Sequence, residues 1–246
     1  MNHLEFLRNL DVIIYHASCQ DGETATHVVR QFCAVEFNKD INDVRCIGIA
    51  AGTDVECVDE LRNKVVLIVD VVPCNIKKIK EISKSIICLD HHISNSEMIP
   101  KMKDWFIFDI NYCATTMAYS FCHGVPATEA PYMLKCIEAR DLEIKRHVAN
   151  MQIVKDCFYE GQGPFTVAMC GCPRHLRSDV GNLCIEQNTD VDFCVMWIFS
   201  PEHQEYWCSL RSTDDRVDVT RFGKGHRNAA GLTLKQSPLQ VFKTLG

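Results

Sequence analysis

The sequence contains no long apolar run, and no stretch approaches the roughly 18 apolar residues that a membrane-spanning helix needs. Near the N-terminus, Glu5, Arg8 and Asp11 interrupt the apolar residues, which argues against a secretory signal peptide. We therefore expect a soluble, cytoplasmic protein without a membrane partner.

The chain also lacks an excess of positive charge. Its 26 lysines and arginines stand against 32 aspartates and glutamates, so the formal net charge is −6. A protein that coats long duplex nucleic acid needs a positive surface, and we therefore do not expect such a partner. A local basic pocket is compatible with this balance. With 246 residues, 47% of them hydrophobic, the chain is long enough for one large or two small globular domains.

The 15 cysteines follow no regular spacing. There is no Cys-x-x-Cys pair, and the shortest spacing is Cys170-Gly-Cys172. This excludes a disulfide framework and a zinc ribbon, and it predicts reduced, mostly buried thiols. Cys170, Cys172 and His175 are close in sequence, but we expect no metal site there because a fourth ligand is missing nearby.

Short β-rich runs alternate with helix-like stretches in the first part of the chain. The strand candidates are Val12–Tyr15, Arg45–Ala50, Val65–Val69, Ile86–Leu89 and Trp105–Phe108. The helix candidates between them are Glu23–Phe32, Asp54–Arg62 and Asn75–Lys84. This alternation is typical of right-handed strand–helix–strand units and predicts a parallel sheet that is buried on both faces.

The remainder of the chain predicts a second, smaller α/β domain. The pattern from Cys113 to Tyr159 is helical, and Gly161-Gln-Gly-Pro164 is the clearest break in the sequence. The predicted division is a larger domain over residues 1–160, a linker and connecting helix over 161–185, and the smaller domain over 186–246. In the smaller domain we expect two strands, 193–200 and 205–212. A glycine-rich loop and helix start over 222–231 and a last short strand over 232–234 should follow them.

Polar residues gather at the carboxyl ends of four predicted strands. These are His16-Ala-Ser-Cys19-Gln-Asp21-Gly22 after the first strand, Asp70 after the third, Asp90-His91-His92 after the fourth and Asp109 after the fifth. In an open parallel sheet, ligands bind at this edge. A lone aspartate after a strand, such as Asp21 or Asp109, is more often a helix cap or a turn residue. Asp70 is different, because it interrupts an apolar run in which an unpaired carboxylate would be costly to bury.

His16, Asp21, Asp70 and His91 together offer imidazole and carboxylate ligands that suit two divalent cations, Mn²⁺ especially. Two such cations, about 3.5–4 Å apart, can activate a hydroxide and stabilise the oxygens of an in-line displacement at phosphorus. The sequence therefore predicts a two-metal centre.

A second cluster lies near the C-terminus. Ser209-Leu-Arg211-Ser212 ends a strand, and the segment from Gly223 to Gly231 is rich in glycine and basic residues. Glycines let backbone amides approach an anion closely. An ordinary turn explains a Gly-x-Gly alone, but the whole cluster predicts a phosphate pocket. Its candidate substrate-binding residues are Arg211, Gly223, Lys224, Gly225, His226 and Asn228.

In this order, the motifs resemble those of the DHH phosphoesterase family. Asp90-His91-His92 resembles the motif that names the family, His16-x-x-Cys19-x-Asp21-Gly22 its first motif and Asp70 its second. The segment 223–231 resembles the Gly-Gly-Gly-His-x-x-Ala-Ala-Gly signature of the DHH-associated C-terminal substrate domain, in which Ser209–Ser212 also has a counterpart. The resemblance implies an α/β fold with a larger parallel-sheet DHH domain, a smaller C-terminal α/β domain and an active site in the cleft between them.

The resemblance also implies roles for individual residues. His16, Cys19 and Asp70 would hold one metal ion. The second ion would be held by Asp21, His91, a shared Asp70 and an aspartate of the fourth motif. His92 would stabilise or protonate the leaving oxygen, supported by Asp90. Arg211, His226 and the backbone of 223–225 would hold a substrate phosphate.

Three positions depart from the family pattern. Most members have aspartate where this chain has Cys19, although a cysteine version of this motif resembles one branch of the family. A thiolate is a softer ligand than a carboxylate, so it could favour Zn²⁺ or weaken Mn²⁺ binding at this position. Mg²⁺ is also compatible with the predicted ligand set. Ala139 stands where the fourth-motif aspartate is expected, so Asp141 or Glu138 substitutes for it or the second site is incomplete. Lys224 replaces a glycine and either adds a charge or narrows the pocket.

The sequence therefore predicts a metal-dependent phosphoesterase that acts on small nucleotides. The candidate substrates are short oligoribonucleotides, linear or cyclic dinucleotides and 3′-phosphorylated nucleotides. The alternative is a catalytically impaired protein that binds or sequesters a nucleotide in the same cleft, and it is motivated by Cys19 and Ala139. A homodimer is compatible with either hypothesis.

Overall fold

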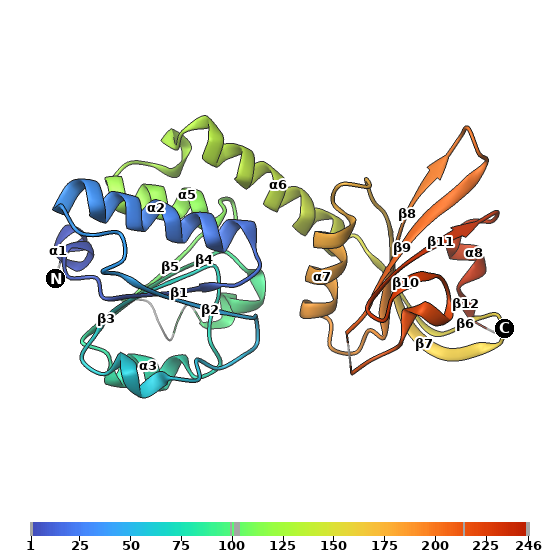
Figure 1. The fold of residues 1–246 in the computed structure, drawn as a ribbon, viewed down its shortest axis with the longest axis horizontal. Coiled ribbons are helices and arrows are strands. Elements are labelled where there is room, and N and C mark those ends of the chain that lie inside the picture. Colours follow the sequence, from blue (N-terminus) through green and yellow to red (C-terminus); the bar gives the residue numbers. More distant parts are fainter. Residues whose placement is uncertain (1, 99, 101–103, 214, 245–246) are drawn as a thin grey trace. The chain divides into compact units, whose positions relative to one another are not determined.

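The computed structural model of the protein describes residues 2–98, 100, 104–213 and 215–244. The chain divides into two compact units, Met1–Leu142 and Glu143–Gly246, and each unit has its own sheet (Figure 1). The predicted α/β class with a parallel first sheet is confirmed. Among the described residues, none of the helices combines the length and hydropathy needed to cross a bilayer.

The first unit contains a five-stranded parallel sheet with the strand order β2-β1-β3-β4-β5. Its strands are β1 (Val12–His16), β2 (Arg45–Ile49), β3 (Val65–Val69), β4 (Ser85–Asp90) and β5 (Phe106–Phe108). Its α-helices are α1 (His3–Arg8), α2 (Gln20–Phe37), α3 (Ile76–Ile82), α5 (Ala114–His123) and α6 (Tyr132–Ala149), the last of which continues into the second unit. The 3₁₀ helices are Val58–Leu61, Ile93–Met98 and Ala127–Glu129.

The central strands of this sheet form by burying β-branched and aliphatic side chains on both faces. In β3 all five residues are buried, with Val65, Leu67 and Val69 on one face and Val66 and Ile68 on the other. Residues of α1, α2 and α5 cover the first face, and residues of α3 and the Val58–Leu61 turn cover the second (Figure 1). Such continuous apolar runs are expected where helices cover both faces of a parallel sheet.

The second unit contains a seven-stranded mixed sheet with the strand order β10-β11-β9-β8-β7-β6-β12. Its strands are β6 (Gln152–Tyr159), β7 (Gln162–Gly171), β8 (Phe193–Ser200), β9 (Glu205–Arg211), β10 (Lys224–His226), β11 (Ala229–Leu234) and β12 (Lys243–Thr244). Its helices are α7 (Arg177–Gln187), α8 (Pro238–Val241) and the 3₁₀ helix Val219–Arg221. An aromatic cluster around Phe193 and Phe222 packs on one face, and α7 packs on the other.

Two segments differ from the sequence prediction. Residues 152–159 form the strand β6 rather than the end of a helix, and residues 162–171 form the strand β7 of the same sheet rather than a linker. The Gly161–Pro164 segment therefore lies in a β-hairpin, and the division between the units falls at Leu142 and not at residue 160. Glycines and prolines mark a hairpin turn and an interdomain linker equally well, and only strand pairing separates the two.

The glycine-rich segment also differs from its prediction. Residues 224–226 and 229–234 are strands that pair in an antiparallel hairpin, and no helix starts there. All 15 cysteines are free thiols, and most of them are buried.

Candidate functional site

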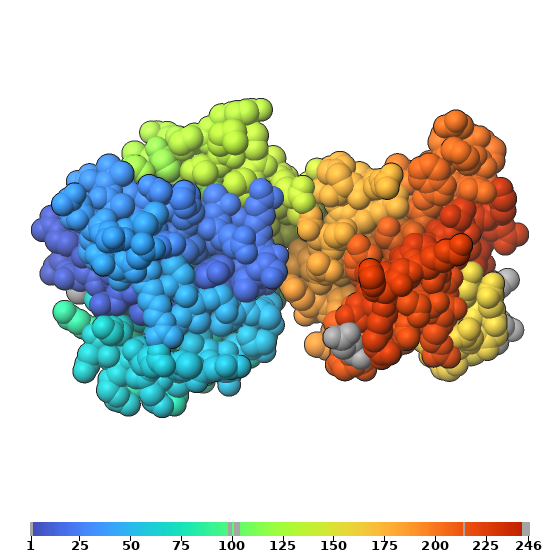
Figure 2. All heavy atoms as spheres, viewed as in Figure 1, coloured from blue at the N-terminus to red at the C-terminus, as the bar shows by residue number. Residues whose placement is uncertain are grey.

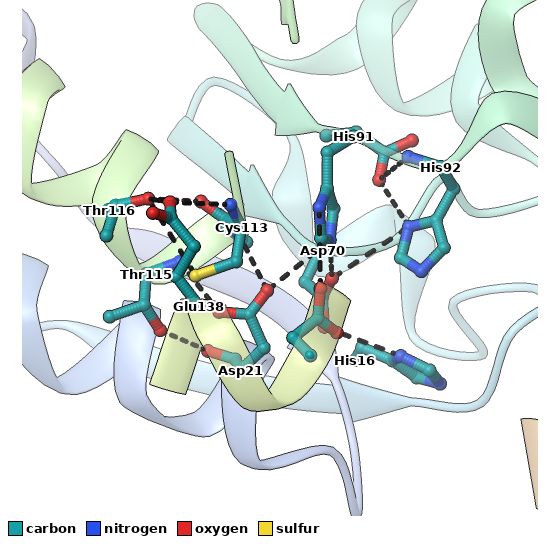
Figure 3. A network of polar contacts seen from close by, with 12 residues as sticks. His16, Asp21, Asp70, His91, His92, Cys113, Thr115, Thr116 and Glu138 are labelled. Atoms are coloured by element: carbon teal, nitrogen blue, oxygen red, sulfur yellow. Dashed lines mark hydrogen bonds and ion pairs between the residues drawn. The ribbon is translucent and has the colours of Figure 1, made fainter. Parts of the chain in front are cut away.

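Three neighbouring strands of the first sheet bring the predicted polar residues to one edge. The register pairs Tyr15 with Val69 and Val69 with Leu89, so the residues that follow them stand at the same level. These residues are His16, Asp70 and Asp90, all buried and all at the carboxyl ends of parallel strands. The side chains of His16 and Asp70 converge with those of Asp21 and His91 (Figure 3).

Asp70 lies at the centre of this site. Its Oδ1 is 3.0 Å from His91 Nε2 and 3.8 Å from His92 Nδ1, and its Oδ2 is 3.5 Å from His16 Nδ1. Burial acts to raise the pKa of Asp70, but hydrogen bonds with His16 and His91 and the charges of His92 and His91 outweigh it. The pKa of Asp70 therefore lies well below its ordinary value. A buried carboxylate with imidazoles on both oxygens is well placed to be shared by two cations.

Asp21 is held from the side of α5. Its two carboxylate oxygens accept hydrogen bonds from the backbone N–H groups of Ala114 (2.7 Å) and Thr115 (2.8 Å) at the start of that helix. Its Oδ2 also lies 3.3 Å from His91 Nε2. Burial, followed by the charge of Asp70, raises the pKa of Asp21. The helix N-terminus orients the carboxylate while a neighbouring carboxylate opposes its charge, so a cation between Asp21 and Asp70 would relieve the repulsion.

Of the two carboxylates that the sequence offered near Ala139, Asp141 lies beside His91. Asp141 Oδ2 lies 3.8 Å from His91 Nδ1, two residues further along α6 than Ala139. Glu138, the other alternative, points elsewhere and accepts hydrogen bonds from Cys113 N (3.2 Å) and from the Thr116 hydroxyl. The structure thus brings Asp141, and not Glu138, to the site.

Cys19 also reaches the site. It is the N-cap residue of α2, in an extended conformation, and its sulfur lies with His16 and Asp70 in one group of potential ligand atoms. Burial, and then the charge of Asp70, raise the pKa of the Cys19 thiol. Because ligand thiols bind metals as thiolates, this group becomes a strong ligand only when a cation offsets the neighbouring negative charge.

Asp90 and His92 form a separate pair beside this centre. His92 Nδ1 lies 2.7 Å from Asp90 Oδ1, and Asn95 Nδ2 donates to Asp90 Oδ2 at 2.6 Å. Burial acts to raise the pKa of Asp90, but the hydrogen bonds from His92 and Asn95 outweigh it, so the pKa is lowered. An ionised Asp90 therefore orients the His92 ring.

The donor atoms fit divalent metal ions. Three overlapping groups have their potential ligand atoms within 4.8 Å of one another: His16, Cys19 and Asp70; Asp70, His91 and His92; and Asp21, His91 and Asp141. Two ligands about 2.1 Å from one ion lie about 3.0–3.4 Å apart at octahedral or tetrahedral angles. The contacts of Asp70 and Asp21 with His91, at 3.0 and 3.3 Å, match this spacing.

Gly22 allows this close packing. A Cβ atom at Gly22 would lie 2.7 Å from the backbone oxygen of His16 and 3.1 Å from Asp70 Oδ2. The glycine of the first motif is thus required by the approach of α2 to the ends of β1 and β3.

Sequence reasoning missed most of the residues that support the ligands. Thr115, Thr116 and Cys113 form the network around Asp21 together with Glu138, which the sequence offered only as a ligand (Figure 3). Asn95 holds Asp90. A side chain that acts through a ligand carries no motif of its own. Only Asn95 had a local signal, as a short polar residue five positions after Asp90.

The predicted substrate-binding residues all lie in the second unit. Lys224, Gly225 and His226 form the exposed edge strand β10, and Asn228 lies in the turn that follows it. A Cβ at Gly223 or Gly225 would lie 2.3 Å from a backbone oxygen of β11, so strand pairing alone requires both glycines. Arg211 ends β9, where its guanidinium donates to Ser178 Oγ (2.8 Å) and to Leu210 O (2.9 Å).

The sequence matches no known protein-family profile. It is 25% identical to the uncharacterized protein R106 of Acanthamoeba polyphaga mimivirus, in an alignment that covers 91% of this chain and 67% of that protein. The name of this relative states no activity.

Among solved structures, an uncharacterized protein from Helicobacter pylori G27 is similar at 17% identity and a TM-score of 0.35, covering 92% of this chain and 93% of that one. An exopolyphosphatase-related protein from Bacteroides fragilis is similar at 12% identity and a TM-score of 0.35, covering 95% and 90%. The pGpG-specific phosphodiesterase PggH from Vibrio cholerae is similar at 8% identity and a TM-score of 0.29, covering 92% and 93%. Likenesses of this size assign neither a family nor an activity to this chain.

Proposed function

We propose that this protein is a metal-dependent phosphoesterase of the DHH type that hydrolyses phosphoester bonds in small nucleotides. The observation that carries the proposal is the position of Asp70 and His91, each of which belongs to two of the three overlapping groups of ligand atoms. A single metal ion needs no shared ligands, whereas two adjacent ions do. The donor set of carboxylates, imidazoles and one thiol suits Mn²⁺ or Zn²⁺.

The residues divide into three roles. His16, Cys19 and Asp70 would hold one cation, and Asp21, His91 and Asp141 the other, with Asp70 shared between them. When bound, the cations would supply Lewis acidity, neutralise phosphate charge and lower the pKa of water. His92 lies outside the two ligand sets but beside Asp70, so its ring can donate a proton to the leaving oxygen while Asp90 holds Nδ1.

The proposal is tested by incubating the full chain with Mn²⁺ and a 5′-phosphorylated dinucleotide. We expect mononucleotides to accumulate in proportion to protein, and two ions per chain by mass spectrometry. Removal of the ions by a chelator should stop the reaction, and restored Mn²⁺ should restart it. A protein that binds the dinucleotide tightly but yields no product with Mn²⁺, Mg²⁺ or Zn²⁺ would instead be the nucleotide-sequestering protein of the alternative hypothesis.

The support of Asp90 by Asn95 predicts a smaller effect. In an Asn95→Ala protein, Asp90 loses one of its hydrogen bonds and the His92 ring loses part of its orientation. Mutation of residues that hydrogen-bond to metal ligands or catalytic groups typically lowers activity about 10- to 100-fold. We expect kcat of Asn95→Ala to fall by a factor in that range while metal content stays the same. Steady-state kinetics measure this. Asn111→Ala is the matched control, because among the described residues the Asn111 side chain donates only to the turn residue Asp109. Equal losses in both proteins would contradict the role of Asn95.

A further inference from the structure

Arg177, at the first position of α7, is a buried cation with few partners. Only 6% of its surface is exposed. Its Nε donates to Cys172 O and its Nη1 to Ser209 Oγ, both at the long distance of 3.3 Å. Its Nη2 is buried and has no hydrogen-bond partner among the described residues, none of which forms an ion pair with Arg177. Buried charges are normally paired, so this guanidinium is suited to an anion.

Its surroundings add positive charge and hydroxyl groups. The charge of Arg174 acts on Arg177, and Arg211 lies on the same side of the sheet, bonded to Ser178 of α7. Asp179, in the first turn of α7, is the carboxylate whose charge acts on Arg211. The N-cap residue of α7, Leu176, has no side chain that could cap the helix, so the positive end of the helix dipole adds to these charges.

An exposed aromatic side chain continues this face of the sheet. In β9, alternate residues share a face, and Ser209 and Arg211 contact α7 whereas Cys208 and Leu210 pack in the opposite core. Trp207 therefore lies on the α7 side, two residues or about 7 Å from Ser209. Its side chain is 37% exposed.

Trp207 stands on the β8–β9 hairpin, which extends beyond the rest of the second unit (Figures 1 and 2). Its cross-strand neighbour Ile198 is 42% exposed. The ring of His203 lies 5.4 Å from that of Trp207, tilted by 47°, and leaves part of the indole open. An open aromatic surface next to a phosphate-binding cation is the usual means by which proteins hold unpaired nucleotides.

We propose that Arg177, Ser209 and Trp207 form a binding site for one unpaired nucleotide, with its phosphate on Arg177 and its base stacked on Trp207. The inference rests on the proposed function only for the class of ligand. It adds a recognition element that lies wholly within the second unit and lies outside the glycine-rich segment singled out in the sequence.

The test is equilibrium binding of a 5′-phosphorylated adenine dinucleotide to the full chain in chelator, so that no hydrolysis occurs. We expect Trp207→Leu to lower the affinity for the dinucleotide about tenfold or more and to leave competition by inorganic phosphate unchanged. We expect Arg177→Met to lower the affinity for the dinucleotide by a similar factor and to abolish competition by inorganic phosphate. Trp207→Phe, which keeps an aromatic ring, should restore most of the affinity.

Two variants serve as matched controls. Phe199→Leu removes an aromatic side chain of similar exposure from the opposite face of the same hairpin, and Arg146→Met removes an exposed arginine of the second unit. Neither should change affinity. Equal loss in Phe199→Leu and Trp207→Leu, unchanged affinity in Trp207→Leu, or a change of oligomeric state in place of affinity would overturn the proposal. If Arg177→Met fails to fold, the proposal is tested by the Trp207 variants and by Arg177→Lys. Arg177→Lys is expected to keep phosphate competition in a weaker form.

Failure of this inference and failure of the proposed function give different results. Asp70→Asn should lose hydrolysis and keep the binding pattern described above. If no hydrolysis is seen with any of the metal ions and the Trp207 and Arg177 variants still lose affinity, the proposed phosphoesterase activity is wrong and the proposed nucleotide-binding site is supported. If hydrolysis occurs and these variants bind normally, the reverse holds.

Discussion

An Asp70→Asn protein should fold normally and lose phosphoester hydrolysis by about three orders of magnitude or more. Asp70 has a φ of +63°, in the left-handed region that asparagine tolerates better than most residues, so the backbone should not change. The amide carries no charge and cannot be shared by two cations as a carboxylate can. Without the metal ions the transition state loses several kcal/mol of electrostatic stabilisation, so the activation free energy rises by that amount. A difference of about 1.4 kcal/mol in activation free energy changes the rate tenfold.

The measurement compares hydrolysis of the dinucleotide with metal content in the same preparation. We expect the bound metal to fall from two ions per chain to one or none. The matched control is Asp109→Asn, because Asp109 follows the next strand at the same edge. Within the part of the chain that the structure describes, its carboxylate accepts hydrogen bonds only from Asn111, in a turn. Asp109→Asn should keep both activity and metal. Full activity in Asp70→Asn would remove the shared ligand on which the two-metal proposal depends.

Gly22→Ala should reduce hydrolysis about 100-fold or more through geometry alone. The new Cβ would meet the backbone oxygen of His16 at 2.7 Å and Asp70 Oδ2 at 3.1 Å, so the start of α2 or the end of β1 must move. Asp21 is the preceding residue and would move with it. A displacement of about 1 Å at a reacting centre can cost about 10²-fold. Overpacking of this kind destabilises a fold by about 1–3 kcal/mol, partly offset by about 1 kcal/mol from the better helix propensity of alanine.

Kinetics and thermal unfolding together separate the two effects. Gly171→Ala is the control, because a Cβ there would have its nearest neighbour at 3.9 Å, the indole nitrogen of Trp197. We expect unchanged hydrolysis in the control and a much greater loss of activity than of stability in Gly22→Ala. Normal metal content and activity in Gly22→Ala would show that α2 can retreat without disturbing the ligands.

The parallel sheet could be predicted because its signal is local. Runs such as Val65–Val69 are buried on both faces, so each is apolar throughout and is recognised without knowledge of its neighbours. The second unit was harder because its sheet is built from hairpins with polar, exposed edges. The strand β10 has three exposed residues, and close contact with β11 leaves no room for a Cβ atom at Gly223 or Gly225.

The candidate site divides in the same way. Residues at the ends of strands, such as His16, Asp70 and Asp90, were identified because the topology of a parallel sheet already brings such ends together. Asp141 could not be separated from Glu138 in the sequence, since both lie on one helix, three residues apart. The rotation of α6 against the sheet decides which carboxylate approaches His91 and which bonds to Thr116.

By itself, the sequence determined the fold class, the central strands and the chemical types at the sheet edge, because burial and alternation are properties of neighbouring residues. The tertiary structure alone decided that Asp141 and not Glu138 approaches His91, that Asn95 and Thr115 donate hydrogen bonds to carboxylates of the site, and that the Arg177 side chain is buried. These depend on contacts between residues far apart in the chain, whose distances no local pattern encodes.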